Sequence, residues 1–214
     1  MSTLKVGAIQ STTGNAAITV ANTGNLTIPG STTFSGAVTG AGMDLLYTLT
    51  SSSSVSSHDI SSTYLNATYD NYYLTGYFEG DGDTKYLQCR VMVGGVVQTS
   101  SIYQNEVQAI GTADDTDNNN TDSHIFTANN VGMGGEDGEG TSVSIFFQNA
   151  NSTRAPFSCS GISSYYNTGG DQEGTIFSGG MLVANRANIV NGLSLKMHSG
   201  NITYATFKFY GLRN

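Results

Sequence analysis

One stretch of the sequence gathers acidic residues whose oxygen atoms could bind a hard cation. These residues are Asp114, Asp115, Asp117 and Asp122. Carboxylate oxygens at alternate positions of a loop are ligands that Ca²⁺ favours. An EF-hand loop would also need Gly at its sixth and Glu at its twelfth position, and counting from Asp115 those positions hold Asn120 and Phe126. The stretch therefore predicts either a calcium site of another kind or a solvated acidic loop.

Tyrosines in polar surroundings indicate a second kind of site, one that binds sugars. The candidates are Tyr72, Tyr73, Tyr165 and Tyr166. An aromatic face offers apolar contact to a sugar ring, and nearby amides and carboxylates can bond its hydroxyls. The chain has no Trp, and tyrosines in β proteins also fill cores and pair across strands. Glycan binding and core packing are therefore both open for these four residues.

Residue patterns typical of catalysis are missing from the sequence. Hydrolysis of a polysaccharide needs two carboxyl groups about 5–10 Å apart, but the acids fall in expected turns, where burial that raises a pKa is not expected. His58, His124 and His198 are scattered and form neither an HExxH motif nor a zinc spacing. The Gly-rich segment 132–140 contains no Lys, which argues against a phosphate loop. We expect a protein that is not an enzyme and has no cofactor other than, in one alternative, calcium.

Composition and charge narrow the range of partners. Charged residues make up 11% of the chain and hydrophobic residues 38%, against about 25% and 45–50% in average globular proteins. The net charge is -8, and the few Lys and Arg side chains are spread along the sequence. Phosphate backbones and anionic membranes attract clustered cations, so we expect neither nucleic acid nor a membrane as a partner.

The cysteines and the N-terminus bear on the compartment. Cys89 and Cys159 are far apart in the sequence, which is not the pattern of a disulfide framework. Two buried strand thiols are expected, and a bridge between them, which would need Cα atoms within about 7 Å, stays open. The first ten residues lack the apolar run of a signal peptide, and no stretch is apolar enough to span a membrane. We expect synthesis in the cytoplasm.

Residues 43–214 show the alternation of a β domain. The expected strands are 45–50, 69–78, 85–93, 142–148, 155–162, 175–183, 192–198 and 202–212. Leu45, Tyr47 and Leu49 are expected on one face of the first strand, and Val143, Ile145 and Phe147 point inward from a later one. With about eight to ten strands and turns between them, the pattern predicts an antiparallel β-sandwich of jelly-roll type.

The segments between these strands carry turn residues. Gly94-Gly95 predicts a tight hairpin, and 199–201 predicts another between the last two strands. Residues 105–140, rich in acids, are expected to form a long loop with a short strand at 125–127, and 163–174 a second loop. A short helical turn is expected within 184–190.

Residues 1–42 differ from the rest, since Lys5 is their single charged side chain. The apolar side chains that we expect to mediate assembly of this segment are Val6, Ile9, Ile18, Val20, Leu26, Ile28 and Phe34. These lie in short runs separated by Gly and Asn, which favour turns. An isolated hairpin is marginal in water, so the segment needs a partner surface. We predict an arm that assembles with copies of itself or docks onto another protein.

The phrases LKVGAIQ, GNLTI and TTFSG in this arm resemble the N-terminal segments of tail-fibre and related virion proteins of marine tailed bacteriophages. The resemblance covers about a fifth of the chain. It implies a virion component made in the host cytoplasm, commonly a homotrimer, whose partners are other virion proteins such as a tail protein or the major capsid protein.

These observations together predict a structural protein. The leading expectation is a trimeric tail fibre or tail-associated appendage that contacts the host surface, where a glycan is a candidate ligand. The alternative is a capsid decoration protein, whose arm would lie across coat subunits. A third class is a stand-alone glycan-binding module.

Overall fold

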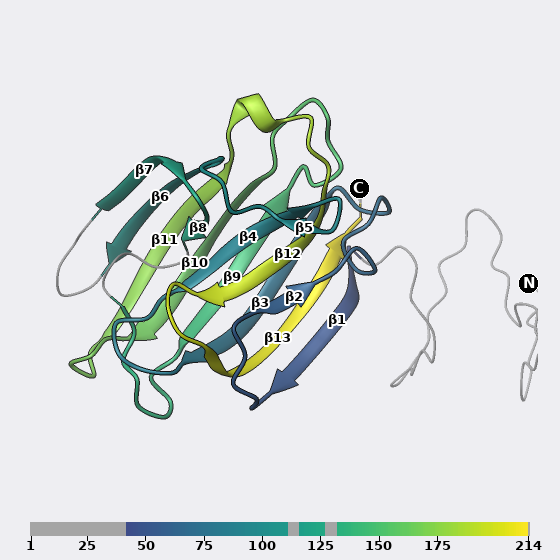
Figure 1. Cartoon of the computed structure of the whole chain (residues 1–214). Coiled ribbons are helices and arrows are strands. Elements are labelled where there is room, and N and C mark those ends of the chain that lie inside the picture. The colour runs from purple at the N-terminus through teal and green to yellow at the C-terminus, as the bar shows by residue number, and fades with distance from the viewer. Residues whose placement is uncertain (1–41, 111–115, 127–131, 214) are drawn as a thin grey trace, which may run out of the picture. The chain divides into compact units, whose positions relative to one another are not determined.

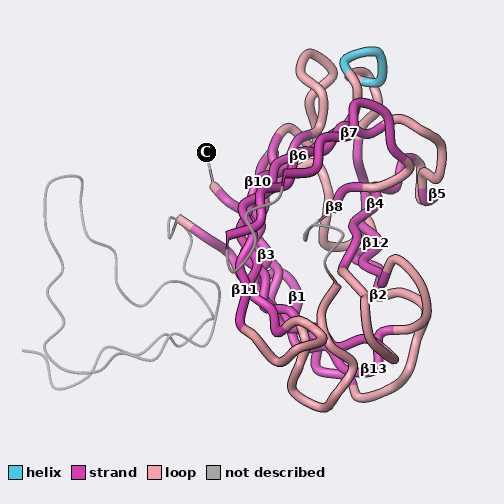
Figure 2. Tube along the Cα trace, turned by 90° about the vertical axis from the view of Figure 1, so that its left-hand side faces the viewer, coloured by secondary structure: helices cyan, strands magenta, loops and turns pink. Residues whose placement is uncertain are grey.

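The computed structural model describes residues 42–110, 116–126 and 132–213 of the chain, and these residues form two antiparallel β-sheets (Figure 1). Viewed edge-on, the sheets are two layers packed face to face (Figure 2). The expected all-β sandwich is confirmed.

The larger sheet has eight strands in the spatial order β1-β13-β3-β9-β10-β11-β6-β7. Their bounds in chain order are β1 (Met43–Ser51), β3 (Asn71–Gly80), β6 (Tyr103–Ile110), β7 (Thr116–Asp122), β9 (Thr141–Gln148), β10 (Ser158–Tyr166), β11 (Gln172–Met181) and β13 (Ile202–Leu212). Each neighbouring pair is antiparallel.

The smaller sheet has the order β2-β12-β4-β5, and β8 also pairs with β4. Its strands are β2 (His58–Ile60), β4 (Leu87–Val93), β5 (Val96–Val97), β8 (Ile125–Phe126) and β12 (Val190–Met197). In the part of the chain that the structure describes, the single helical element is a 3-10 turn at Val183–Asn185, at the edge of the segment where a helical turn was expected. No helix among these residues is long and apolar enough to cross a bilayer.

The core lies between the two sheets and is built from alternate strand positions. In β9, Val143, Ile145 and Phe147 are buried as predicted, while the residues between them face outward. Aromatic rings fill much of the space, and Phe147 lies 5.9 Å from Phe157 between ring centroids. Truncation of a buried Phe to Ala costs about 3–5 kcal/mol, so these rings contribute a large part of the stability.

The first strand departs from the expected alternation because it contains a β-bulge. The pairing with β13 shifts between Leu45 and Tyr47. As a result Tyr47 packs on the core while Leu45 is 56% exposed on the outer face. A bulge inserts one extra residue and so exchanges the two faces of a strand. The prediction that Leu45 shares a face with Tyr47 is therefore wrong.

The expected long loop at 105–140 is also wrong over its first half, which contains β6 and β7. Tyr103, Asn105, Val107 and Ala109 point inward from β6, and the residues between them are exposed. The expected loop at 163–174 is shorter, because β10 continues to Tyr166 and β11 begins at Gln172.

Two predicted hairpins have different outcomes. Gly94 and Gly95 both have positive φ, 61° and 79°, and connect β4 to β5 by a two-residue turn, which confirms that hairpin. The turn at 199–201 is no hairpin, because β12 belongs to the smaller sheet and β13 to the larger. Alternation along a strand shows which face is buried but not which sheet the strand joins.

The two ends of the sandwich domain are tied together at Asp44. Its Oδ2 accepts hydrogen bonds from the Tyr69 hydroxyl at 2.5 Å and from the Arg213 guanidinium at 2.6 Å. The hydrogen bond from Tyr69, with the hydrogen bond and charge of Arg213, holds the pKa of Asp44 below its usual value. This carboxylate therefore links β1, the segment before β3 and the residue after β13.

Cys89 and Cys159 are free, buried thiols and form no disulfide with each other. This confirms the expectation of two buried strand thiols. Cys89 belongs to β4 in the smaller sheet and Cys159 to β10 in the larger. Burial raises the pKa of Cys89 well above its usual value and that of Cys159 to about 12. A buried thiol that stays protonated is a poor nucleophile.

Candidate functional site

The structure divides the four candidate sugar-binding tyrosines between the core and the surface. Tyr72 and Tyr165 are fully buried. The Tyr72 ring stacks on Phe209 with centroids 5.2 Å apart, and its hydroxyl donates to the Asn66 carbonyl at 2.7 Å; burial raises its pKa to about 12. A sugar cannot reach a ring enclosed in this way, so the assignment of Tyr72 and Tyr165 to a glycan site is wrong.

Tyr165 shows how a tyrosine that lies among polar residues in the sequence can still be buried. Its hydroxyl donates to the Glu173 carboxylate at 2.9 Å, and the Asn167 amide donates to the other carboxylate oxygen at 2.8 Å. A buried hydroxyl or carboxylate needs such partners. The polar neighbours that suggested a sugar site therefore satisfy the core.

Tyr73 and Tyr166 do lie on the outer face of the larger sheet, half-buried and 42% exposed respectively. Tyr73 is next to Phe146 in the register, and Phe146 is next to Ser160. Tyr166 lies six residues further along β10 than Ser160, a distance of roughly 20 Å along a strand. The structure does not bring these two tyrosines into one site.

Of the four predicted calcium ligands, the structure describes Asp117 and Asp122, and it does not bring these two together. Asp114 and Asp115 lie outside the described residues. Asp117 and Asp122 are in β7, opposite Val107 and Tyr103 of β6. Five strand residues span roughly 16 Å, which is too far for one ion, since Ca²⁺ binds oxygens at about 2.3–2.6 Å.

Asp122 instead contacts His124, and Ser123 lies between them. Its Oδ1 is 3.1 Å from the His124 Nδ1, and the Ser123 hydroxyl is 3.1 Å from the same nitrogen. A nucleophilic triad needs the carboxylate and the hydroxyl on opposite ring nitrogens. This arrangement therefore fixes a chain segment and does not activate the serine.

Glu79 near the end of β3 and the acids of the turn that follows it accept hydrogen bonds from backbone amides of neighbouring loops. The Asp83 Oδ1 accepts from the Gly135 amide at 2.8 Å, and the Glu79 Oε1 accepts from the Gly138 amide at 3.2 Å. The Asp81 Oδ2 accepts from the Asn201 amide at 2.9 Å. Among the described residues no group of three or more His, Cys, Asp or Glu side chains is arranged to hold a metal. These carboxylates stabilise the loops at one end of the sandwich.

The outer face of the larger sheet carries a groove that the sequence did not predict. It has a volume of about 500 Å³ and crosses the four neighbouring strands β9, β10, β11 and β6. The outward-facing residues that line it are Gln104, Glu106, Gln148, Ser158, Ser160, Ser178 and Gly180.

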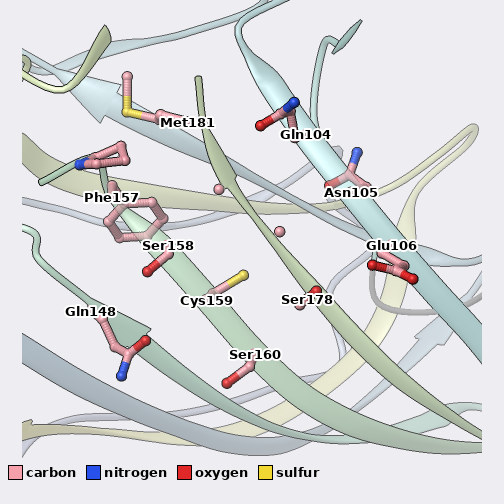
Figure 3. Close-up of a pocket in the computed structure, with 13 residues that line it drawn as sticks. Gln104, Asn105, Glu106, Gln148, Phe157, Ser158, Cys159, Ser160, Ser178 and Met181 are labelled. Carbon is pink, nitrogen blue, oxygen red and sulfur yellow. The ribbon is translucent and has the colours of Figure 1, made fainter. Parts of the chain in front are cut away.

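The groove exists because small residues on the two middle strands are flanked by long ones on the two outer strands. Ser160 and Ser178 are directly opposite in the β10–β11 pair, and Gly180 is opposite Ser158. Gln148 of β9 rises on one side, and Glu106 of β6 rises on the other, next to Ser178. Figure 3 shows the two walls with the serine side chains between them.

Apolar side chains border the groove. Phe146 is 46% exposed next to Ser160, and its ring lies 4.7 Å from that of Tyr73 between centroids. Ile162 and Ile176 are paired with each other two residues further along, and they are 58% and 51% exposed. A surface with hydroxyls, amides and one carboxylate beside an aromatic ring can bind a ligand that is both polar and apolar.

Sequence reasoning missed the groove because its residues come from four strands that are not all consecutive. Alternation alone would have placed Ser158, Ser160 and Ser178 on one face of their strands. It could not show that β6 lies beside β11, which brings Glu106 to the site.

Comparison with known proteins finds no matching family model, no matching curated protein and no matching solved structure.

Proposed function

We propose that this chain is a non-enzymatic structural component of a tailed-phage virion, whose sandwich contacts another surface through the outer face of the larger sheet. The arm sequence, with its LKVGAIQ, GNLTI and TTFSG phrases, supports the virion setting. A trimeric tail fibre or tail-associated appendage on the host-facing side is the form that we favour.

The observation that carries the contact role is the character of the outer face. Its central strands β13, β3, β9, β10 and β11 expose Phe146, Ile162 and Ile176, and the charged side chains facing outward from them are Glu79 and Lys208. Contact surfaces are poor in charge and carry aromatic and aliphatic residues at their centre. The same face would serve a decoration protein on a capsid.

Copy number in purified virions tests this proposal and separates its two forms. An appendage is present in few copies, whereas a decoration protein is present in proportion to the coat protein. Quantitative mass spectrometry of purified particles measures the ratio, and sedimentation of the full chain should give about three times its mass of 22.4 kDa for a trimer. Absence of the chain from purified particles would overturn the virion role.

A further inference from the structure

We infer that the groove between Gln148 and Glu106 on the outer face binds a neutral saccharide. The inference deepens the proposed function by naming the class of surface ligand, and it rests on that function only for its biological setting. The residues of this groove differ from Tyr72, Tyr73, Tyr165 and Tyr166, the candidate sugar-binding residues of the sequence analysis.

The floor of the groove presents hydroxyl groups that are available to a ligand. Ser160 and Ser178 are exposed, and Ser158 is half-buried. The structure records no side-chain hydrogen bond from these three serines to any other described residue. Each hydroxyl can donate one hydrogen bond and accept two. Sugar hydroxyls have the same dual capacity, so a row of serines matches a row of ligand hydroxyls.

The walls add groups that orient such a ligand. Gln104 and Gln148 offer amides, which both donate and accept, from opposite sides of the floor. The Glu106 carboxylate accepts only, and hydrogen bonds to a charged acceptor are stronger than neutral ones. This set is suited to hydroxyl groups on both edges of one sugar ring.

Charge selects a neutral ligand over an acidic one. Glu106 is the one ionisable side chain among the described residues that line the groove on its outer side, and no Lys or Arg lines it. The chain as a whole carries a net charge of -8. A uronic acid, sialic acid or phosphorylated sugar would meet like charge without a cation to balance it.

Phe146 supplies the apolar contact that a sugar ring needs. It stands next to Ser160 at the edge of the floor, and it is held against Tyr73, whose hydroxyl is 2.7 Å from the Ser144 hydroxyl. Its position is therefore fixed while 46% of it stays exposed. Aromatic rings combine a large apolar surface with few rotatable bonds, which lowers the entropy cost of binding.

The size of the groove agrees with an oligosaccharide. Its volume of about 500 Å³ lies within the range of about 300–1,000 Å³ that is usual for ligand sites. The groove is open rather than enclosed, so a chain of sugars could enter from the side. A protein partner is the competing occupant, and the absence of retention on any glycan in the test below would favour it over a saccharide.

The test is a glycan array that carries neutral and acidic glycans, probed with the labelled full-length chain. The decisive variant is Ser178→Tyr, which fills the floor; position 178 is exposed, and Tyr is favourable in strands. Thr48→Tyr is the matched control, since Thr48 is exposed on β1 of the same sheet and outside the groove. Thermal unfolding of both variants verifies the fold.

We expect retention of the wild-type chain on neutral glycans, with affinity for the best of them reduced at least about tenfold by Ser178→Tyr and by Glu106→Gln. Thr48→Tyr should bind within about twofold of wild type, a difference of less than about 0.5 kcal/mol. No retention on any glycan, a preference for acidic glycans, or equal binding by Ser178→Tyr would each overturn the inference.

A second measurement keeps this outcome separate from that of the proposed function. If Ser178→Tyr is incorporated into virions at the wild-type level while glycan retention is lost, both proposals stand. Retention of glycans by a chain that is absent from virions would support the groove and overturn the virion role.

Discussion

A Cβ added to Gly76 of β3 would collide with the neighbouring strand β13, and we predict that Gly76→Ala destabilises the sandwich strongly. A Cβ at this position would lie 2.3 Å from the Phe207 Cβ and 2.7 Å from the Thr206 carbonyl oxygen. Favourable contacts between carbon atoms begin at about 3.5 Å, so the overlap exceeds 1 Å. Because Gly76 is paired with β13 on one side and β9 on the other, the strand cannot move away. Overpacking of this kind costs about 1–3 kcal/mol or more.

Urea unfolding of the full chain, followed by tyrosine fluorescence, measures this loss. The expected loss of about 1–3 kcal/mol in unfolding free energy would lower the Tm by roughly 2–12 °C in a parallel thermal unfolding of a domain of this size. Gly174→Ala is the control, since it lies in β11 of the same sheet and its Cβ would meet no atom closer than 3.5 Å. That variant should be neutral or slightly more stable, because Ala loses less backbone entropy than Gly on folding. Equal unfolding midpoints for the two variants would refute the argument from close packing.

Three further predictions concern charge, thiols and loops. The pKa of Asp44 is lowered in the folded state, so its ionised carboxylate stabilises the fold fully above its unfolded pKa of about 3.8, and this contribution is lost as pH falls below that value. Asp44→Asn should therefore weaken the dependence of the unfolding free energy on pH in the acidic range. An unchanged pH dependence would contradict this. Cys89 and Cys159 should resist a thiol-specific reagent in native buffer and react fully in denaturant, so rapid modification of the native chain would show that they are not buried. Asp83→Ala, which removes the acceptor of the Gly135 amide, should cost about 0.5–1.5 kcal/mol and accelerate proteolysis within 132–140, as mass spectrometry of limited digests would show; an unaltered digestion pattern would count against this brace.

Local sequence patterns predicted a strand and its buried face well where one face of the strand was apolar and the other polar. Residues 142–148 alternate apolar and polar residues without interruption, and β9 follows that pattern. In β6 the same alternation is present, but Glu106 and two glutamines on the outer face gave the segment the composition of a loop. The bulge after Leu45 could not be predicted, since nothing in the sequence of β1 marks the extra residue.

The position of the candidate groove could not be predicted from the sequence. Polar and aromatic residues indicated sugar binding, yet Tyr72 and Tyr165 satisfy their hydroxyls inside the core. The groove depends on strand order, which arises from contacts between segments far apart in sequence. Gln104 and Gly180 are 76 residues apart and lie directly opposite each other in the sheet. No window of local sequence contains that relation.

The alternation of faces has an evolutionary consequence for the outer surface. Along β10 and β11, buried residues such as Cys159 and Phe177 alternate with groove residues such as Ser158, Ser160 and Ser178. Substitutions at the floor positions change what the surface presents without altering the volume of the interior. A lineage could therefore exchange one ligand for another through a few outward-facing codons, while selection for folding acts on the codons between them.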